Sequence, residues 1–420
     1  MTALLLPALR WRPACFIAFV SVGVLVGPLW AQTCCILPDS SGRRGAVPTL
    51  ISTDTVVPLS AGMPKDVFPG QAWEPRSPAQ VGMDTARLDR IAATLGSSGC
   101  VVKDGYVVKT WGDVSRQYDW YSSGKPIFST LLFFAIHEGR VSGMDEKIGK
   151  WNWPLKGKDQ GITFRHLANM TSGYLQPEAP GEAYAHNDFA VALLMHTLER
   201  VFGQSITEAA RQRIYDPLGM QDDPHHQAVT QGWKARGRAW ISVRDWARLA
   251  WFWTNKGNWN GRQLLPMSYF EKHMRPQVPR DLPYSRGPDV SGKLPGDTLS
   301  EDYLGVCSFG GGSNHYNYGV GLYGSHWYFN TSGTVGALRL RNKLEDSGSD
   351  RSFDQIWPGL PSEMTMTVGW GINTVMIPSK GLVLVCAENA RWGRPYLAPN
   401  EPVNHGIMKL LTESLGEEGP

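Results

Sequence analysis

The sequence predicts an α/β (α+β) fold with one antiparallel sheet, built from strands near both ends of the chain and flanked by helices. Two hairpin patterns, at residues 100–111 and 371–387, and a series of apolar helical patterns between them support this prediction. Strands at the two ends of a domain can bury their apolar faces by pairing with each other. We therefore expect the helical region to be inserted between the strands of a single sheet.

The first hairpin follows a short amphipathic helix. Asp84 is placed to cap this helix, its apolar residues recur on one face, and Gly96 ends it. Two runs rich in valine then lie on either side of the dipeptide Asp104-Gly105. This dipeptide is typical of the type I′ turn that joins two antiparallel strands.

The middle of the chain shows helical periodicity. A helix is expected from Ser122 onward, and residues 126–136 are apolar on nearly every side of it, which predicts that this helix is buried. Further helical patterns occupy residues 189–202, 206–214 and 243–255. Residues 275–324 have no clear period, and a stretch of that length usually folds over a site or carries function.

Strand signals return late in the chain. Residues 371–377 and 382–387 are apolar and rich in β-branched side chains, and the turn-forming residues 378–381 separate them. This pattern predicts a second hairpin. A closing helix is expected over about residues 403–415.

The N-terminus has the pattern of an export signal. Arg10 and Arg12 precede an apolar run over residues 15–26, and Ala31 offers a small residue for cleavage. We therefore expect a signal peptide at 1–31 and a periplasmic or secreted mature protein with no stable membrane span. The alternative is an uncleaved N-terminal anchor.

The remaining chain divides into three predicted parts. Residues 32–75 are rich in Pro, Ser, Thr and Gly and predict an extended lead segment. Residues 76–120 together with 325–420 form the sheet-containing part, and residues 121–324 form a mainly helical part. The formal net charge is +3 without a basic run, so no nucleic-acid partner is expected. The sequence carries no signal for an oligomeric state.

Ser122 and Lys125 form the most informative motif. A serine hydroxyl is a poor nucleophile near neutral pH and needs a base within hydrogen-bond reach. Residues three apart on a helix share a face, and burial beside an apolar run lowers the pKa of a lysine. Ser122 and Lys125 therefore match the S-x-x-K motif of penicillin-recognising serine enzymes. The alternative is a helix-capping serine followed by a surface lysine.

A second motif, Tyr184-Ala185-His186, precedes an apolar helical pattern. A tyrosine beside a serine and a lysine can act as general base if the lysine charge lowers its pKa. The alternative is a loop tyrosine packed on the helical part. No G-x-S-x-G occurs, which argues against an α/β-hydrolase. Residues 222–226 have metal-binding side chains but no spaced ligand set, so we expect a loop there and no metal site.

From Pro75 to the C-terminus, the chain resembles the β-lactamase-related serine hydrolases. This group includes class C β-lactamases, D-alanyl peptidases, family VIII carboxylesterases and 6-aminohexanoate-dimer hydrolases. The segments that carry the resemblance occur in the family's order: 105–112, 121–125, 162–173, 180–194, 242–250 with 258–261, and 357–384. Several ordered segments together are more specific than any single motif. The resemblance implies a β-lactamase/transpeptidase-like fold.

The resemblance also implies roles for individual residues. Ser122 would attack a carbonyl and form an acyl-enzyme, and Lys125 would help to remove its proton. Tyr184 would relay a proton to the leaving group and activate the deacylating water. The N–H of Ser122 and one from the strand near Gly371 and Ile372 would form the oxyanion hole. This chemistry needs no metal or cofactor.

Two departures from the family pattern bear on the substrate. His186 stands where the family has asparagine; it can still donate a hydrogen bond to a substrate amide, and it can titrate near neutral pH. Gly369-Trp370-Gly371 stands where the family has a lysine or histidine motif that helps to hold a substrate carboxylate. We therefore expect His186, Trp370, Gly371 and Ile372 to contact the substrate. Arg391 or Arg394 is a candidate substitute cation.

These observations predict an exported serine hydrolase that cleaves small carboxylic esters or amides through Ser122, Lys125 and Tyr184. A small-molecule ester or amide would be its partner. The first alternative is a β-lactamase or D-alanyl-D-alanine peptidase, against which the missing cation argues. The second is a catalytically inactive, ligand-binding member of the fold.

Overall fold

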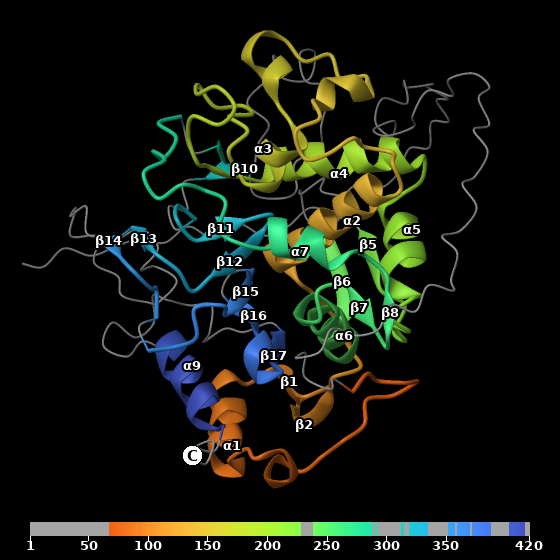
Figure 1. Ribbon diagram of the computed structural model, residues 1–420, viewed down its shortest axis with the longest axis vertical. Coiled ribbons are helices and arrows are strands. Elements are labelled where there is room, and N and C mark those ends of the chain that lie inside the picture. The colour runs from red at the N-terminus through yellow and green to blue at the C-terminus, as the bar shows by residue number, and fades with distance from the viewer. Residues whose placement is uncertain are drawn as a thin grey trace, which may run out of the picture. The chain divides into compact units, whose positions relative to one another are not determined.

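The computed structural model describes most of the chain from residue 67 onward (Figure 1). The described residues are 67–227, 238–287, 290–291, 312–314, 319–334, 352–357, 359–369, 372–387 and 403–415. The predicted signal peptide, residues 32–66 of the predicted lead segment, and Trp370, Gly371, Arg391 and Arg394 lie outside them.

An antiparallel sheet of seven strands, in the order β11-β12-β15-β16-β17-β1-β2, forms the base of the fold. The strands are β1 (Ser98–Lys103), β2 (Tyr106–Trp111), β11 (Tyr323–Gly324), β12 (Trp327–Phe329), β15 (Thr365–Val368), β16 (Ile372–Ile377) and β17 (Leu382–Ala387). The first strand therefore lies beside the last, with Val102 opposite Val383. This confirms the predicted antiparallel sheet with contributions from both ends of the chain.

Both predicted hairpins are present in this sheet. Asp104 and Gly105, at the tip of the first, have φ angles of 52° and 87°, as a type I′ turn requires. The second hairpin joins β16 to β17 through a short 3₁₀ turn, η7 (Pro378–Lys380). Every residue of β16 and β17 is buried, which shows that both faces of the sheet are covered here.

Helices from distant parts of the chain cover the sheet (Figure 1). Helix α1 (Thr85–Leu95) is capped by the Asp84 side chain, as predicted, and packs against α9 (Val403–Glu413). On the other side of the strands, α6 (Val243–Thr254) packs along β1, β16 and β17.

The remaining helices lie above or to the right of β15, β16 and β17 in the view of Figure 1. They are α2 (Lys125–His137), α3 (Phe164–Ala168), α4 (Asp188–Phe202), α5 (Ile206–Ala210) and α7 (Met267–His273). Helix α2 is buried over most of its length, as its apolar sequence predicted, and packs against α4. The predicted helix over 206–214 becomes a π-helical turn, η5 (Arg211–Tyr215), after α5.

Short strands and 3₁₀ turns complete the described chain. The strands pair as β3 (Gln117–Asp119), β6 (Arg238–Ser242) and β5 (His225–Gln227); as β4 (His186–Asn187), β10 (Gly312–Asn314) and β9 (Val290–Ser291); as β7 (Asn258–Trp259) with β8 (Arg262–Gln263); and as β13 (Gly333–Thr334) with β14 (Ser352–Phe353). The 3₁₀ turns are η1 (Pro78–Val81), η2 (Tyr121–Gly124), η3 (Ile148–Trp151) and η4 (Gly157–Gly161).

The start of the helix expected at Ser122 differs from the prediction. Ser122 lies in the 3₁₀ turn η2, and the α-helix begins at Lys125. Pro126 explains the difference, because an α-helix that included Ser122 would need an N–H from residue 126 to its carbonyl oxygen, and proline has none.

Two further findings concern the described residues. None of their helices is long and apolar enough to cross a membrane. Cys100 and Cys386 are buried thiols on the neighbouring strands β1 and β17, and burial raises the pKa of Cys100 to about 12. Such a thiol is inert toward oxidation near neutral pH.

Candidate active site

The turn that carries Ser122 is anchored by Trp120, which directly precedes it. The Trp120 ring stacks on Trp246 of α6, with ring centroids 4.1 Å apart and planes 8° apart. Its indole N–H donates to the carbonyl of Ile241 at 2.8 Å, and its backbone N–H donates to Ala239. Ser122, which is partly exposed, is therefore presented from a rigid base.

Tyr121, next to Ser122, adopts a strained conformation. Its φ of 47° lies in the left-handed region, where a bulky residue is rare. The Asp119 carboxylate accepts the Tyr121 backbone N–H at 2.9 Å and pairs with two guanidinium nitrogens of Arg238. Arg238 in turn lies 4.2 Å from the centre of the Tyr121 ring. The three residues together hold the backbone that leads into Ser122.

The other side of the turn is tied to the sheet through Asn373 of β16. Its Oδ1 accepts the Ser123 hydroxyl at 2.9 Å and the Gly369 backbone N–H at 3.0 Å. Its Nδ2 donates to the carbonyl of Cys386 on β17. Gly369 is required here because a Cβ would lie 2.8 Å from the Ser123 nitrogen. These contacts bring Gly369, the first residue of the predicted third motif, against the turn that carries Ser122.

Lys125 is buried, with only 2% of its surface exposed, which excludes the surface-lysine interpretation. Its Nζ lies 2.9 Å from Nε2 of His186 and 3.6 Å from a carboxylate oxygen of Asp188. Burial lowers the pKa of Lys125 to about 8; the Asp188 charge opposes this shift, and the charge of Arg238 adds to it. A substantial fraction of Lys125 is therefore neutral near physiological pH.

The second motif reaches Lys125 through His186, which lies on β4 just before α4. The next residue, Asn187, caps α4 by accepting the N–H of Ala190 and donates its Nδ2 to the carbonyl of Tyr174. The His186 imidazole therefore lies beside Lys125, whereas the side chain of the adjacent Asn187 caps α4. Asp188, in the first turn of α4, is a site residue that the sequence reasoning missed. The sequence signal for Asp188 is a carboxylate at the first position of an otherwise apolar helical pattern.

Tyr184 is buried between two other tyrosines. Its ring packs edge-to-face on Tyr284 and Tyr323, at centroid distances of 6.4 and 5.7 Å. Its backbone N–H donates to Pro283, and its carbonyl accepts from Ser285. A Cβ on Gly319 would lie 2.1 Å from the Tyr184 hydroxyl, so a glycine is needed for the ring to lie where it does.

A second histidine, His326, lies behind Lys125. It forms the tip of the β11–β12 hairpin with Ser325, and both have positive φ angles, 47° for Ser325 and 72° for His326. Its Nδ1 lies 2.8 Å from the hydroxyl of Ser129, one helical turn after Lys125. Burial, with Lys125 and His186 nearby, holds the pKa of His326 well below its usual range. His326 is therefore neutral, and its position could not be predicted from local sequence patterns.

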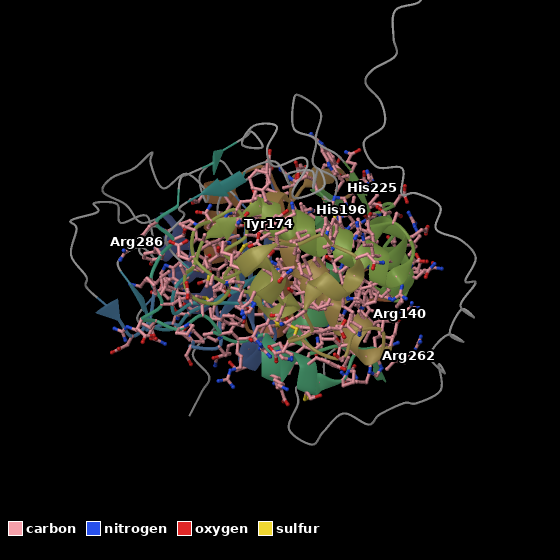
Figure 2. All side chains as sticks on the ribbon, turned by 90° about the horizontal axis from the view of Figure 1, so that it is seen from above. Arg140, Tyr174, His196, His225, Arg262 and Arg286 are labelled. Atoms are coloured by element: carbon pink, nitrogen blue, oxygen red, sulfur yellow. The ribbon has the colours of Figure 1, made fainter. Side chains whose placement is uncertain are left out.

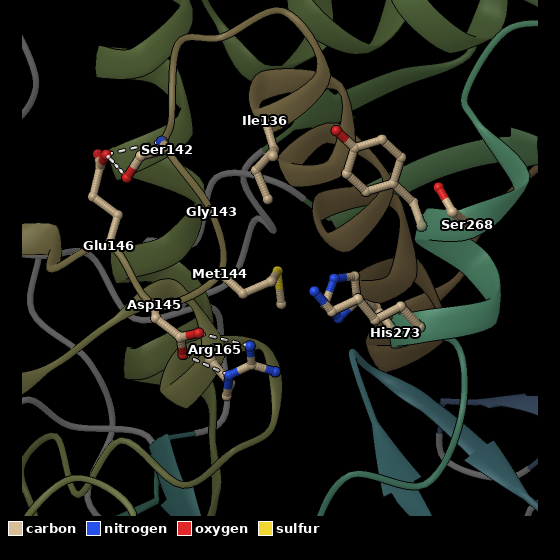
Figure 3. Close-up of a pocket in the computed structure, with 11 residues that line it drawn as sticks. Ile136, Ser142, Gly143, Met144, Asp145, Glu146, Arg165, Ser268 and His273 are labelled. Atoms are coloured by element: carbon tan, nitrogen blue, oxygen red, sulfur yellow. Dashed lines mark hydrogen bonds and ion pairs between the residues drawn. The ribbon is translucent and has the colours of Figure 1, made fainter.

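A cavity lies at the end of α2 that is far from Ser122 (Figure 3). It has a volume of about 740 Å³ and is lined by Ile136, Met144, His273 and the ion-paired Arg165 and Asp145, among others. Burial lowers the pKa of His273 to about 4. Helix α2 spans 13 residues, roughly 20 Å. The cavity is thus remote from Ser122, and we place the candidate active site at the N-terminal end of α2.

The residues with metal-binding side chains near His225 have other partners. His225 lies at the periphery of the molecule (Figure 2), with its Nδ1 2.9 Å from the carbonyl of Asp223. His226 contacts the hydroxyl of Tyr215, and Asp222 pairs with Arg244. Within the described residues, no group of three or more His, Cys, Asp or Glu side chains is arranged to hold a metal ion.

The antiparallel sheet flanked by helices, with a helical region between its strands, is the architecture of the β-lactamase/transpeptidase-like fold. Residues 85–356 match the model of the Beta-lactamase family, so the chain belongs to this family of serine hydrolases. An uncharacterized protein of Alkalihalophilus pseudofirmus is 21% identical over 243 residues, covering 48% of this chain and 71% of that protein.

Solved structures show the same fold. A putative 6-aminohexanoate-dimer hydrolase from Bacillus anthracis has a TM-score of 0.53 at 15% identity, covering 82% of this chain and 88% of its own. A family VIII carboxylesterase has a TM-score of 0.52 at 11% identity, covering 79% and 97%. A penicillin-binding protein homolog from Caulobacter crescentus has a TM-score of 0.51 at 14% identity, covering 80% and 99%. This confirms the predicted β-lactamase/transpeptidase-like fold.

Proposed function

We propose that the protein is an exported serine hydrolase that cleaves small carboxylic esters or amides through an acyl-enzyme on Ser122. The observation that carries the proposal is the burial of Lys125 one turn after Ser122, with its pKa lowered to about 8. A buried lysine of this kind can accept a proton near neutral pH, which an exposed lysine does poorly.

The proposed reaction has two balanced halves. Neutral Lys125 accepts the Ser122 proton as Oγ bonds to the carbonyl carbon, and the leaving oxygen or nitrogen departs with that proton, delivered by Lys125 directly or relayed through the Tyr184 hydroxyl. Water then attacks the acyl-enzyme and gives a proton to Lys125, directly or through Tyr184. Lys125 passes this proton to Ser122 Oγ as the bond between Oγ and the acyl carbon breaks, which releases the carboxylic acid. The Ser122 N–H and a strand N–H at Gly371 or Ile372 would bind the developing oxyanion.

A neutral substrate suits this site better than an anionic one. The third-motif position reads Gly369-Trp370-Gly371 and lacks the family's cation. Arg238, which lies against the ring of Tyr121, is already paired with Asp119 at 2.6 Å. We therefore rank esters and amides without a carboxylate above β-lactams and D-alanyl peptides. Rapid nitrocefin turnover would reverse this order.

The test is hydrolysis of p-nitrophenyl acetate and butyrate by wild type, Ser122→Ala and Ser123→Ala. Ser122→Ala should lower kcat by about a thousandfold or more with an unchanged melting temperature, because it removes the nucleophile. Ser123→Ala is the comparison variant: it keeps the Ser122 hydroxyl, loses one hydrogen bond to Asn373, and should lower kcat far less than Ser122→Ala. Equal activity in wild type and Ser122→Ala would refute the proposal. Tight ligand binding without turnover by wild type would favour the inactive alternative.

A further inference from the structure

Lys125 is enclosed by groups from four elements. His186 approaches from β4 and Asp188 from α4, at 2.9 and 3.6 Å from Nζ. The positive charge of Arg238 on β6 lowers the pKa of Lys125, and the ion pair between Arg238 and Asp119 weakens this effect. Neutral His326, at the β11–β12 turn, lies behind Lys125. Of these groups, His186 has a ring nitrogen at hydrogen-bond distance from Nζ, and a neutral imidazole nitrogen can accept a proton.

We infer that His186 accepts a proton from Lys125 during turnover, so that Ser122 is activated through a serine–lysine–histidine relay. The inference rests on the proposed function and extends it. An asparagine at this position can hold the lysine through its amide oxygen but cannot accept a proton. The imidazole Nε2 can do both, and it already lies at hydrogen-bond distance from Nζ.

The relay balances as follows. The Lys125 ammonium gives one proton to Nε2 of His186, which leaves a neutral amine and an imidazolium. The amine accepts the Ser122 proton as Oγ bonds to the carbonyl carbon, and then delivers that proton to the departing group. The imidazolium finally returns its proton to Lys125. The pair carries one positive charge before and after this cycle, and the Asp188 carboxylate lies near it throughout.

The relay has a consequence for pH dependence. Without it, the reactive form must have lost the Lys125 proton to solvent, so reactivity falls as the pH drops below the pKa of about 8. With it, the singly protonated pair is also reactive, because the proton can rest on His186 while Lys125 acts. Reactivity then persists to a lower pH.

A fluorophosphonate probe tests this without knowledge of the natural substrate. The rate of labelling is measured from pH 5.5 to 10 for wild type, His186→Asn and His186→Gln. His196→Asn serves as control, because His196 pairs with Glu199 and lies elsewhere on α4. We expect both His186 variants to react at least about tenfold more slowly than wild type at pH 7 and within about threefold of it at pH 9.5. As the pH is lowered, the labelling rate of the His186 variants should begin to fall near pH 8, a higher pH than for wild type.

The outcomes separate the two proposals. If wild type is not labelled, or Ser122→Ala is labelled equally, the proposed hydrolase function fails. If labelling depends on Ser122 but the His186 variants differ from wild type by a constant factor at every pH, His186 only positions Lys125 and the relay is refuted. If the pH profiles of the His186 variants are identical to that of wild type, the relay is refuted as well. Melting curves at pH 7 confirm that each variant compared is folded.

Discussion

Lys125 is subject to two opposing electrostatic effects. Burial disfavours its charged form, whereas the Asp188 carboxylate, 3.6 Å away, favours it. The balance leaves the pKa at about 8, near the range in which an amine serves as a base. Asp188 sits in the first turn of α4, where the helix dipole stabilises its negative charge.

Replacing Asp188 with Asn should lower the pKa of Lys125 below about 8, because the variant keeps the burial and loses the opposing charge. The measurement is an NMR titration of lysines labelled at Cε, in which Lys125 titrates apart from the exposed lysines. Asp145→Asn, remote from Lys125 and paired with Arg165, is the control. An unchanged or raised pKa in Asp188→Asn would contradict the described ion pair.

Gly319→Ala should displace the Tyr184 ring, because the new Cβ would lie 2.1 Å from its hydroxyl and the ring is packed between Tyr284 and Tyr323. We expect at least about a tenfold fall in kcat/KM if Tyr184 relays a proton. Gly149→Ala, where a Cβ meets nothing within 4 Å, is the matched control. Wild-type kcat/KM in Gly319→Ala would show that Tyr184 is not needed in this position.

At the scale of elements, the turn η2, which carries Ser122, is held on one side by α6 and β6 and on the other by β16. Trp120 ties it to α6 and β6, and Ser123 ties it to β16 through Asn373. The site is thus built where a helix, a small sheet and the main sheet meet. Ser122 depends for its position on contacts that none of these elements makes alone.

Asn373→Ala should destabilise the fold by about 1–3 kcal/mol, because it leaves the buried Ser123 hydroxyl and the Gly369 N–H without their acceptor. It should also slow acylation more than Thr374→Val, the control. Thr374 is the next residue on β16, and its replacement by valine removes only the hydrogen bond that the Trp246 indole N–H donates to the Thr374 hydroxyl. Chemical denaturation and fluorophosphonate labelling measure the two effects. Equal labelling rates in both variants would argue against a role for Asn373 in holding the turn.

Local signals were sufficient for the elements and for part of the site. The cap at Asp84, the Asp104-Gly105 turn and the apolar run after Lys125 each act within a few residues, and the structure agrees with them. Asn373 and His326 were not predicted, because their partners Ser123 and Ser129 lie 250 and 197 positions away in the sequence. Periodicity says which face of a strand is buried, but not which distant side chain it meets.

At the scale of the whole molecule, the two ends of the described chain pack on each other. Leu88 and Ile91 of α1 and Met408 and Leu411 of α9 are buried in the same core. The N–H of Asp84, which caps α1, donates to the carbonyl of Ser414 just after α9. The closing helix is therefore part of the core.

Met408→Ala should lower the free energy of unfolding by about 2–5 kcal/mol, since it leaves a cavity between α1 and α9. Lys409→Ala, at an exposed position on the same helix, should change it by less than about 0.5 kcal/mol. Urea denaturation at one pH compares the two. Similar values for both variants would show that α9 contributes little to the core.

The place of β1 in the sheet has a consequence for the order of events during biosynthesis. Strand β1 lies between β2 and β17, and Gly96 and Cys386, which are in contact, stand 290 positions apart. A ribosome therefore adds about 290 residues after the start of β1 before β17, its second neighbour, exists, and contacts of such long range form slowly. During that interval β1 is paired on one side at most, and the core between the sheet and its helices is incomplete. A chain that has not completed its fold can pass through a translocation channel, which is consistent with the proposed export before folding.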